Sequence, residues 1–328
     1  MRKVKEIKNE KGIIISFNKF SDEYLNYHKS NWKNYFISAK DELFILLEKY
    51  NGFEHILLND LIDNFERIIK ATPSEIPSII DHFTTGNFAH LLISLTGDKT
   101  DLCKDIEKAF DYINFRSSAK ASWFCEKIEI KSCLYCNAQF TLAVGKNGSS
   151  KKMLFQLDHF YNKRSYPFLS LTLGNLIPCC SSCNIAKSKK EFNIDDNFHP
   201  YHEDLSSNFT FKVDEENILK YLIEKRDMDF LKPTIVTTNA KVLEHVKNFR
   251  IEHIYNKHTD VIEELILKSL YYNSTKREEL LNTFEELNLD QSTIDRFILG
   301  NYTLNSEINK RPLSKLSSDI AKQLKIIK

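Results

Sequence analysis

Two Cys-x-x-Cys pairs, separated by 43 residues, constrain the fold of this chain more than any other feature of its sequence. The first pair is Cys133 and Cys136, and the second is Cys180 and Cys183. Each pair presents two thiols from one turn, and four thiolates are a common ligand set for structural Zn²⁺. The separation exceeds that of a simple zinc ribbon, so the residues between the pairs must fold to bring the two turns together. We predict a zinc-stapled unit in the middle of the chain.

The other cysteines are expected to be packing residues. The chain has seven cysteines, and its basic N-terminus lacks the apolar stretch of a signal peptide, so we do not expect disulfides. Free cysteines behave as small buried hydrophobes, and we assign Cys103 and Cys125 to this class. Cys179 adjoins the second pair, but Cys180 has the better spacing to Cys183, so Cys179 is expected to pack in the core.

Composition predicts a cytoplasmic and largely helical protein. Only 8 glycines and 7 prolines occur in 328 residues, which favours long helices over a turn-rich β architecture. No apolar run approaches the roughly 20 residues of a membrane helix, so we expect no membrane partner. The net charge is +1, but residues 146–190 carry +7 and leave −6 elsewhere. Such a local basic surface is expected where phosphates bind, although a solvated lysine-rich face has the same composition.

Apolar residues recur at helical spacing on both sides of the cysteine pairs. Within residues 1–125, the segments 41–48 and 56–69 each show one apolar face. From Ala240 onward the same spacing returns and predicts further amphipathic helices. The last segment, 307–328, contains six basic and two acidic residues and is expected to be a solvated end.

Between the cysteine pairs the pattern changes to that of strands. Residues 153–157 alternate in hydrophobicity and predict a short strand, and Asn147-Gly148 predicts a turn that pairs it with residues 139–144. A helix is expected from about 182 to 190. Residues 209–213 alternate again and are expected to close this unit.

Asp158 and His159 follow this alternating segment and have the residue types that phosphodiester hydrolysis needs. Histidine can act as a general base near neutral pH, and carboxylate and amide oxygens suit a hard divalent cation. Asn184 and Lys187 lie three residues apart in the expected helix, so an amide ligand and a phosphate-binding ammonium would share one face. Alone, an Asp-His step is a weak signal, because a single histidine is more often a hydrogen-bonded structural residue. We assign the same structural role to the histidines of His199-Pro-Tyr-His202.

Within residues 130–201, these motifs together resemble the HNH (His-Me finger, ββα-metal) endonucleases. The resemblance is carried by Cys133-x-x-Cys136, by Leu157-Asp158-His159-Phe160 and by Asn175-Leu-Ile-Pro-x-Cys180-x-x-Cys183-Asn184-x-x-Lys187. It implies that His159 is the general base and that Asp158 and Asn184 bind a catalytic Mg²⁺ or Mn²⁺. It also implies that Asn175 orients the loop that bears the histidine. Asn184 replaces the last histidine of the HNH letters.

The implied fold is α+β, with a zinc-stapled ββα core in residues 126–215 between helical regions 1–125 and 216–328. The substrate would be DNA. The nucleic-acid contacts are expected from Lys151, Lys152, Lys163, Arg164, Lys189 and Lys190, with Lys187 at the catalytic centre.

The segments 158–163 and 166–169 also resemble the PtuB-type HNH effectors of bacterial Septu and retron anti-phage systems. This narrower resemblance implies an ABC/SMC-like ATPase partner that licenses the nuclease. Two alternatives remain open from the residues: a zinc-scaffolded DNA- or protein-binding module without catalysis, and a toxin-like nuclease held off by an inhibitor.

Overall fold

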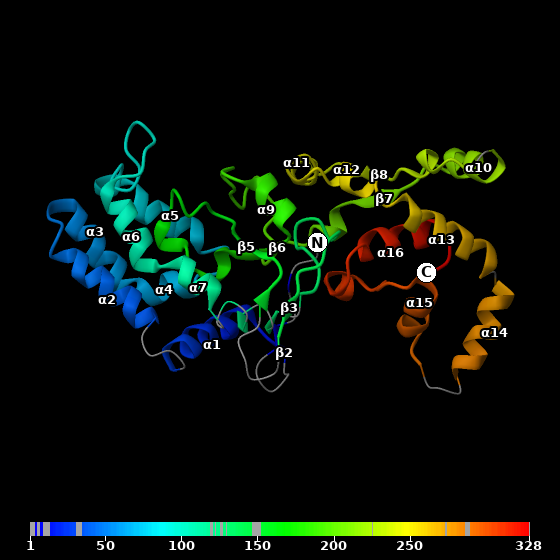
Figure 1. The fold of residues 1–328 in the computed structure, drawn as a ribbon, viewed down its shortest axis with the longest axis horizontal. Coiled ribbons are helices and arrows are strands. Elements are labelled where there is room, and N and C mark those ends of the chain that lie inside the picture. Colours follow the sequence, from blue (N-terminus) through cyan, green and yellow to red (C-terminus); the bar gives the residue numbers. More distant parts are fainter. Residues whose placement is uncertain are drawn as a thin grey trace.

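The fold is mainly helical, with small two-stranded antiparallel sheets (Figure 1). The computed structural model describes residues 4, 7–8, 14–30, 35–118, 121, 123–124, 127–128, 130–145, 152–224, 226–272, 274–285 and 289–327. In Figure 1 the N-terminal helices lie on one side of a central pair of strands, and the last helices of the chain lie on the other. Among the described helices, none combines the length and the apolar character needed to cross a bilayer.

The N-terminal region is helical, as its periodicity predicts. A short hairpin, β1 (Ile7–Lys8) and β2 (Ile14–Ile15), precedes the helices. The helices are α1 (Phe17–Ser30), α2 (Tyr35–Leu47), α3 (Gly52–Asp63), α4 (Phe65–Lys70), α5 (Ile76–Thr84), α6 (Asp101–Phe110) and α7 (Tyr112–Ser117). The expected helix over 56–69 is interrupted at Asn64, which separates α3 from α4.

The middle of the chain forms two hairpins and a helix. Strand β3 (Ala143–Val144) pairs with β4 (Lys152–Met153), and β5 (Gln156–His159) pairs with β6 (Leu176–Cys179). Helix α9 (Ser181–Lys187) follows β6 after one residue. The expected single strand over 153–157 is therefore wrong, because the chain leaves the first hairpin after Met153 and enters the second at Gln156. The turn residues Asn147-Gly148 lie outside the described part of the chain.

The C-terminal region is built from helices and one further hairpin. Its elements are β7 (Thr210–Lys212), α10 (Glu215–Ile223), β8 (Thr234–Val236), α11 (Ala240–Phe249), α12 (Ile251–Tyr255), α13 (Thr259–Tyr271), α14 (Ser274–Glu285), α15 (Gln291–Leu299) and α16 (Ser314–Gln323). The alternation over residues 209–213 corresponds to strand β7, and its partner is β8 rather than a strand of the cysteine unit.

Helix α16 is buried along most of its length, so the expectation of a solvated end is also wrong. All eight residues from Ser314 to Ala321 are buried. Lys315 Nζ lies 2.8 Å from Asp319 Oδ1, and Asp319 Oδ2 accepts a hydrogen bond from the Phe211 amide at 2.9 Å. Composition suggested a polar surface because it counts charges without showing that two of them neutralise each other inside the fold.

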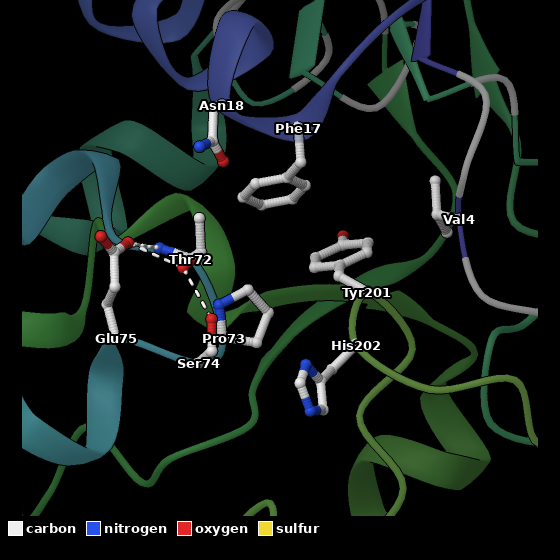
Figure 2. A pocket seen from close by; sticks show the side chains of 9 residues that line it. All are labelled: Val4, Phe17, Asn18, Thr72, Pro73, Ser74, Glu75, Tyr201 and His202. Atoms are coloured by element: carbon white, nitrogen blue, oxygen red, sulfur yellow. Dashed lines mark hydrogen bonds between the residues drawn. The ribbon is translucent and has the colours of Figure 1, made fainter.

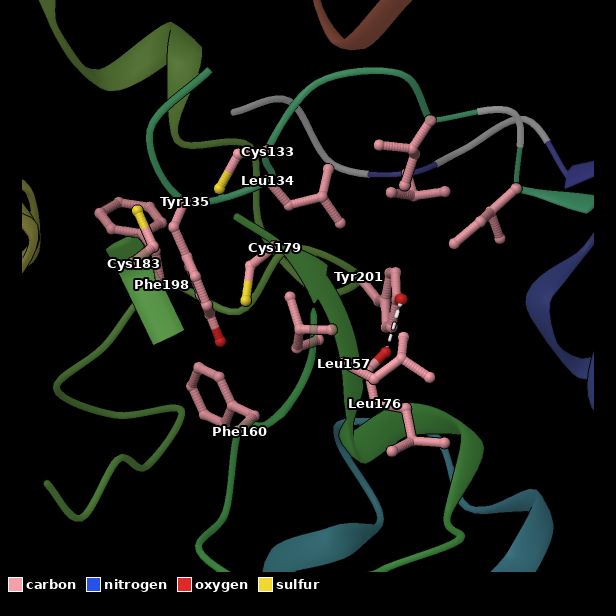
Figure 3. Packing of buried hydrophobic residues seen from close by; sticks show 14 of the residues in the cluster. Cys133, Leu134, Tyr135, Leu157, Phe160, Leu176, Cys179, Cys183, Phe198 and Tyr201 are labelled. Atoms are coloured by element: carbon pink, nitrogen blue, oxygen red, sulfur yellow. Dashed lines mark hydrogen bonds between the residues drawn. The ribbon is translucent and has the colours of Figure 1, made fainter. Parts of the chain in front are cut away.

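The core surrounds the two cysteine turns. Figure 3 shows side chains from the turns packed with Leu157 of β5, Leu176 of β6 and Tyr201. Tyr201 Oη donates to the Leu176 carbonyl at 2.7 Å, which holds the segment after α9 against β6. The β5–β6 pair is therefore enclosed by hydrophobic side chains, and its last residues form a rigid base for the site.

Candidate metal centre and the adjoining Asp-His site

The four cysteines of the two Cys-x-x-Cys pairs meet in one buried cluster. The Sγ atoms of Cys133, Cys136, Cys180 and Cys183 all lie within 4.8 Å of one another. The Cys136 and Cys180 sulfurs are 3.9 Å apart, close to the ~3.8 Å expected between thiolates around a tetrahedral Zn²⁺ with Zn–S bonds of about 2.3 Å. The cluster can therefore hold a structural metal such as zinc.

Backbone amides point at the sulfurs, as thiolate ligands require. The Cys180 amide donates to Cys133 Sγ at 3.3 Å, and the Cys183 amide donates to Cys180 Sγ at 3.4 Å. Hydrogen bonds from the other cysteines, Cys133 first, hold the pKa of Cys180 well below its usual range, which favours the thiolate. Cys179 is buried outside the cluster, as its spacing predicts.

The other two cysteines have different outcomes. Cys103 is buried on α6, and burial raises the pKa of its thiol to about 11, so it is an inert packing residue as expected. Cys125 lies outside the described residues.

Asn137 joins the first cysteine turn to the far end of the chain. Its backbone is left-handed, with φ of 54°, a conformation that asparagine tolerates better than most residues. Its Nδ2 donates to the Ile308 carbonyl at 2.9 Å, and its Oδ1 accepts from the Lys315 amide at 3.2 Å. Its carbonyl accepts from the Leu313 amide at 2.6 Å. The turn is thus completed by residues more than 170 positions later in the sequence.

Asp158 is buried at the end of β5 and is held by two donors. Tyr135 Oη donates to Asp158 Oδ2 at 2.7 Å. The Lys187 ammonium lies 3.2 Å from Oδ2 and 3.4 Å from Oδ1, and it also donates to the His159 carbonyl at 2.6 Å. Burial raises the pKa of Asp158, while the positive charge of Lys187 and the Tyr135 hydroxyl oppose this shift. The structure therefore places a positive group beside this carboxyl.

His159 is held in one tautomer. Its Nε2 lies 3.0 Å from the Ser170 carbonyl, and because a carbonyl only accepts, Nε2 carries the proton and Nδ1 keeps the lone pair. Burial lowers the pKa of His159 to about 3, and the nearby charge of Lys163 adds to the shift. The ring is therefore neutral at physiological pH. Its Nδ1 carries the lone pair of the ring and, with so low a pKa, is a weak base.

Asn175 fastens the loop between β5 and β6 at both ends. Its Oδ1 accepts from the Tyr161 amide at 2.7 Å, and its Nδ2 donates to the carbonyls of Tyr161 and Leu169 at 3.0 and 3.1 Å. The preceding Gly174 packs so closely on the N-terminal helical region that an added Cβ would lie 2.4 Å from the Ala71 carbonyl oxygen. The loop that supplies the acceptor for His159 is thereby fixed from two sides.

The sequence analysis did not predict two tyrosines of the site. Tyr112, at the start of α7, places its ring 4.4 Å from the His159 ring in an edge contact, and its hydroxyl donates to the Leu157 carbonyl at 2.8 Å. The Lys163 ammonium lies 4.5 Å from the centre of the same ring. Tyr135 stands inside the first Cys-x-x-Cys pair. Neither tyrosine carries a local sequence signal, because their partners come from other elements.

Asn184 lies on α9 one turn before Lys187 and is half-buried. Among the described side chains, no hydrogen bond joins it to Asp158. Lys187 reaches Asp158 from the same helix, and the expectation that Asn184 shares its face toward the site stays a prediction.

Some of the expected nucleic-acid-binding residues lie close together. The Asn162 amide and the Ser165 hydroxyl both donate to Glu191 Oε1, at 3.3 and 2.9 Å. These bonds join the loop that carries residues 163–164 to the segment that carries Lys189. Residues 164 and 189 are exposed, and residue 163 is half-buried.

The other expected contacts are separate from this group. The exposed Lys190 donates to Asn248 Oδ1 of α11 at 2.7 Å. Lys152 is exposed on β4, in the first hairpin. Lys151 lies outside the described residues.

The two histidines of the 199–202 segment do not form a metal site. His199 is fully buried, and both of its ring nitrogens are engaged, Nε2 with the Gly174 carbonyl at 2.8 Å and Nδ1 with the Tyr201 amide at 3.2 Å. His202 instead lines a cavity of about 490 Å³, together with Val4, Phe17, Asn18, Thr72, Pro73, Ser74, Glu75 and Tyr201 (Figure 2). The structural role expected for His199 fits these bonds.

No protein-family model matches the chain, and comparisons with curated proteins and with solved structures find no match either. The class of the protein is therefore defined by its own geometry. It is a mixed α/β protein with small antiparallel sheets and a buried four-cysteine cluster that can bind a metal.

Proposed function

We propose that this protein is a metal-dependent endonuclease of the HNH type that hydrolyses phosphodiester bonds of DNA. One observation carries the proposal: β5 ends in Asp158-His159, pairs antiparallel with β6, and is followed by α9, while the cysteine cluster ties α9 to the first cysteine turn. This strand–strand–helix order brings the Lys187 ammonium to the Asp158 carboxylate and to the backbone carbonyl of His159.

The residues have distinct roles in this proposal. His159 accepts a proton from the attacking water through Nδ1, since its other nitrogen is committed to the Ser170 carbonyl. Asn175 holds the loop that provides this carbonyl. Lys187 supplies positive charge close to both Asp158 and His159. His159 lies on the paired strand β5, Asn175 directly precedes β6, and Lys187 lies on helix α9.

A divalent cation would be held by Asp158 and Asn184. Their carboxylate and amide oxygens are the donors that Mg²⁺ and Mn²⁺ prefer, so the chemistry of the donor set fits. The Lys187 ammonium lies against both Asp158 oxygens in this structure, so a cation bound there would compete with it. When bound, the cation would stabilise negative charge on the scissile phosphate. The structural zinc of the cysteine cluster would be a separate ion.

We also propose a partner, an ABC/SMC-like ATPase, in a bacterial anti-phage defence system. Several described helices outside the cysteine region expose large apolar side chains, among them Leu219 and Ile223 on α10 and Leu270 on α13. The excess of negative charge outside residues 146–190 would weaken independent binding to DNA, because affinity for DNA comes largely from phosphate neutralisation.

A second candidate is a zinc-scaffolded binding module without catalysis. It is favoured by the low exposure of the two central residues, 6% for Asp158 and 7% for His159, which limits the access of water and substrate. The cysteine cluster and the exposed lysines are compatible with both a nuclease and a binding module, so they do not distinguish between the two.

A plasmid-cleavage assay with Mg²⁺ or Mn²⁺ separates the two candidates. His159→Asn removes the imidazole base, so cleavage should fall by about 10²–10⁴-fold while zinc content and DNA affinity stay near wild type. His199→Asn is the matched control, because this histidine is equally buried and also bonds to a backbone carbonyl. It should lose stability but retain cleavage per folded molecule. Unchanged cleavage in His159→Asn would favour the binding module.

A further inference from the structure

Tyr135 connects the cysteine cluster directly to Asp158. It is the third residue of the first Cys-x-x-Cys pair, so its backbone position is fixed by the two cysteines that flank the turn. Its side chain is fully buried and extends from the turn into the core (Figure 3). At its far end the hydroxyl donates to Asp158 Oδ2 at 2.7 Å.

Helix α11 holds the same tyrosine from the opposite side. The Phe249 ring stacks on the Tyr135 ring, with centroids 4.4 Å apart and an interplanar angle of 15°. His245 Nε2 donates to the Tyr135 carbonyl at 2.7 Å. The ring therefore cannot turn away from Asp158 without breaking its stacked contact with Phe249.

The carboxyl of Asp158 needs such a partner to keep one orientation. The terminal torsion of an aspartate is soft, so its hydrogen-bond partners decide where its oxygens point. Lys187 lies at similar distances from both oxygens, 3.2 and 3.4 Å, and does not distinguish between them. The Tyr135 hydroxyl contacts Oδ2 alone. It therefore fixes Oδ2, while Oδ1 accepts the longer 3.4 Å contact from Lys187.

We propose that Tyr135 is a positioning residue through which the metal-bound cysteine turn sets the orientation of the Asp158 carboxylate. The inference rests on the proposed function, in which Asp158 binds the catalytic cation. It adds that the structural zinc site and the catalytic site are mechanically coupled through one side chain. Groups that orient a metal ligand typically contribute 10–100-fold to metal affinity or activity.

Tyr135→Phe tests the coupling, with Tyr255→Phe as its matched control. Both tyrosines are fully buried, and both hydroxyls donate at 2.7 Å, but Tyr255 bonds to the Cys136 carbonyl of the same turn instead of to Asp158. Three properties are measured on the full-length zinc-loaded protein: thermal stability, Mn²⁺ affinity by electron paramagnetic resonance, and the rate of plasmid cleavage. The absorbance of a cobalt-substituted sample reports whether the four-thiolate cluster is intact.

We expect Tyr135→Phe to weaken Mn²⁺ binding and to slow cleavage by about 10–100-fold, with the cobalt spectrum unchanged. Tyr255→Phe should lose a similar amount of stability and keep the wild-type Mn²⁺ affinity. Equal Mn²⁺ affinities in the two variants would overturn the positioning role and leave Tyr135 as a structural residue. Failure of the proposed function looks different: wild-type protein would then neither bind Mn²⁺ outside the cysteine cluster nor cleave DNA, which would overturn both proposals.

Discussion

Replacing Lys187 with methionine should be among the most destabilising single changes in the site. Lys187 is 1% exposed, and its ammonium lies 3.2 Å from Asp158 Oδ2 and donates to the His159 carbonyl at 2.6 Å. Methionine has a similar length and fills the same space, so the change removes charge rather than volume. It leaves a buried carboxylate without its counter-ion, which typically costs about 3–5 kcal/mol. That is a large part of the ~5–15 kcal/mol that stabilises an ordinary domain.

Urea unfolding followed by circular dichroism measures the loss. Lys189→Met is the matched control, because Lys189 is exposed on the same segment and should change the free energy of unfolding by less than about 0.5 kcal/mol. Combining Lys187→Met with Asp158→Asn removes both charges, so the double variant should recover part of the lost stability. A loss below about 1 kcal/mol for Lys187→Met, or no recovery in the double variant, would refute the assignment of a buried ion pair.

The pH dependence of the same variant has a definite sign. Burial raises the pKa of Asp158 above its usual value, so the folded protein takes up this proton more readily than the unfolded chain. The stability linked to the group is therefore present at low pH and is lost as pH rises through the folded pKa. Once Asp158 is protonated it no longer needs a counter-charge. The deficit of Lys187→Met should accordingly shrink as pH falls, and a deficit that grows in acid would contradict the model.

Two further predictions concern the metal and the partner. Purified protein should contain about one Zn²⁺ per chain, and Cys180→Ser should unfold the cysteine region, whereas Cys103→Ser should keep the metal, because metal-binding energy at such sites is folding energy. Metal analysis with circular dichroism checks this, and well-folded protein without zinc would contradict it. Co-expression with the product of the neighbouring gene should give a complex on size-exclusion chromatography that cleaves faster than the chain alone. A chain that elutes alone and cleaves at full rate needs no partner.

The cysteine cluster was predictable because its signal is local. Each Cys-x-x-Cys pair fixes two sulfurs on one turn, and cysteines with no disulfide partners at that spacing have few other uses. The same reasoning separated Cys179 from the ligands. The flanking helices followed from apolar spacing, with the α3–α4 break at Asn64 as an exception.

The parts that sequence reasoning missed depend on contacts between distant segments. Strand β6 carries Pro178, which lacks an amide donor and reads as a loop, yet it pairs with Leu157 of β5 in a sheet of only two strands. The two tyrosines of the site, Tyr112 and Tyr135, donate hydrogen bonds to residues of β5, which lies far from them in the sequence. The burial of α16 depends on the pairing of Lys315 with Asp319, which composition cannot show.

The hydrogen bonds made by Asn137 set an order for folding during synthesis. A ribosome releases the chain from its N-terminus, and regions fold as their partners appear. Both cysteine pairs leave the ribosome long before residues 308–315, which supply the partners of Asn137 on the first turn. From the emergence of residue 183 to that of residue 315 the nascent chain therefore carries all four thiols and the Asp158-His159 step, but one cysteine turn lacks its final support. The site reaches its finished form only after residue 315 has emerged.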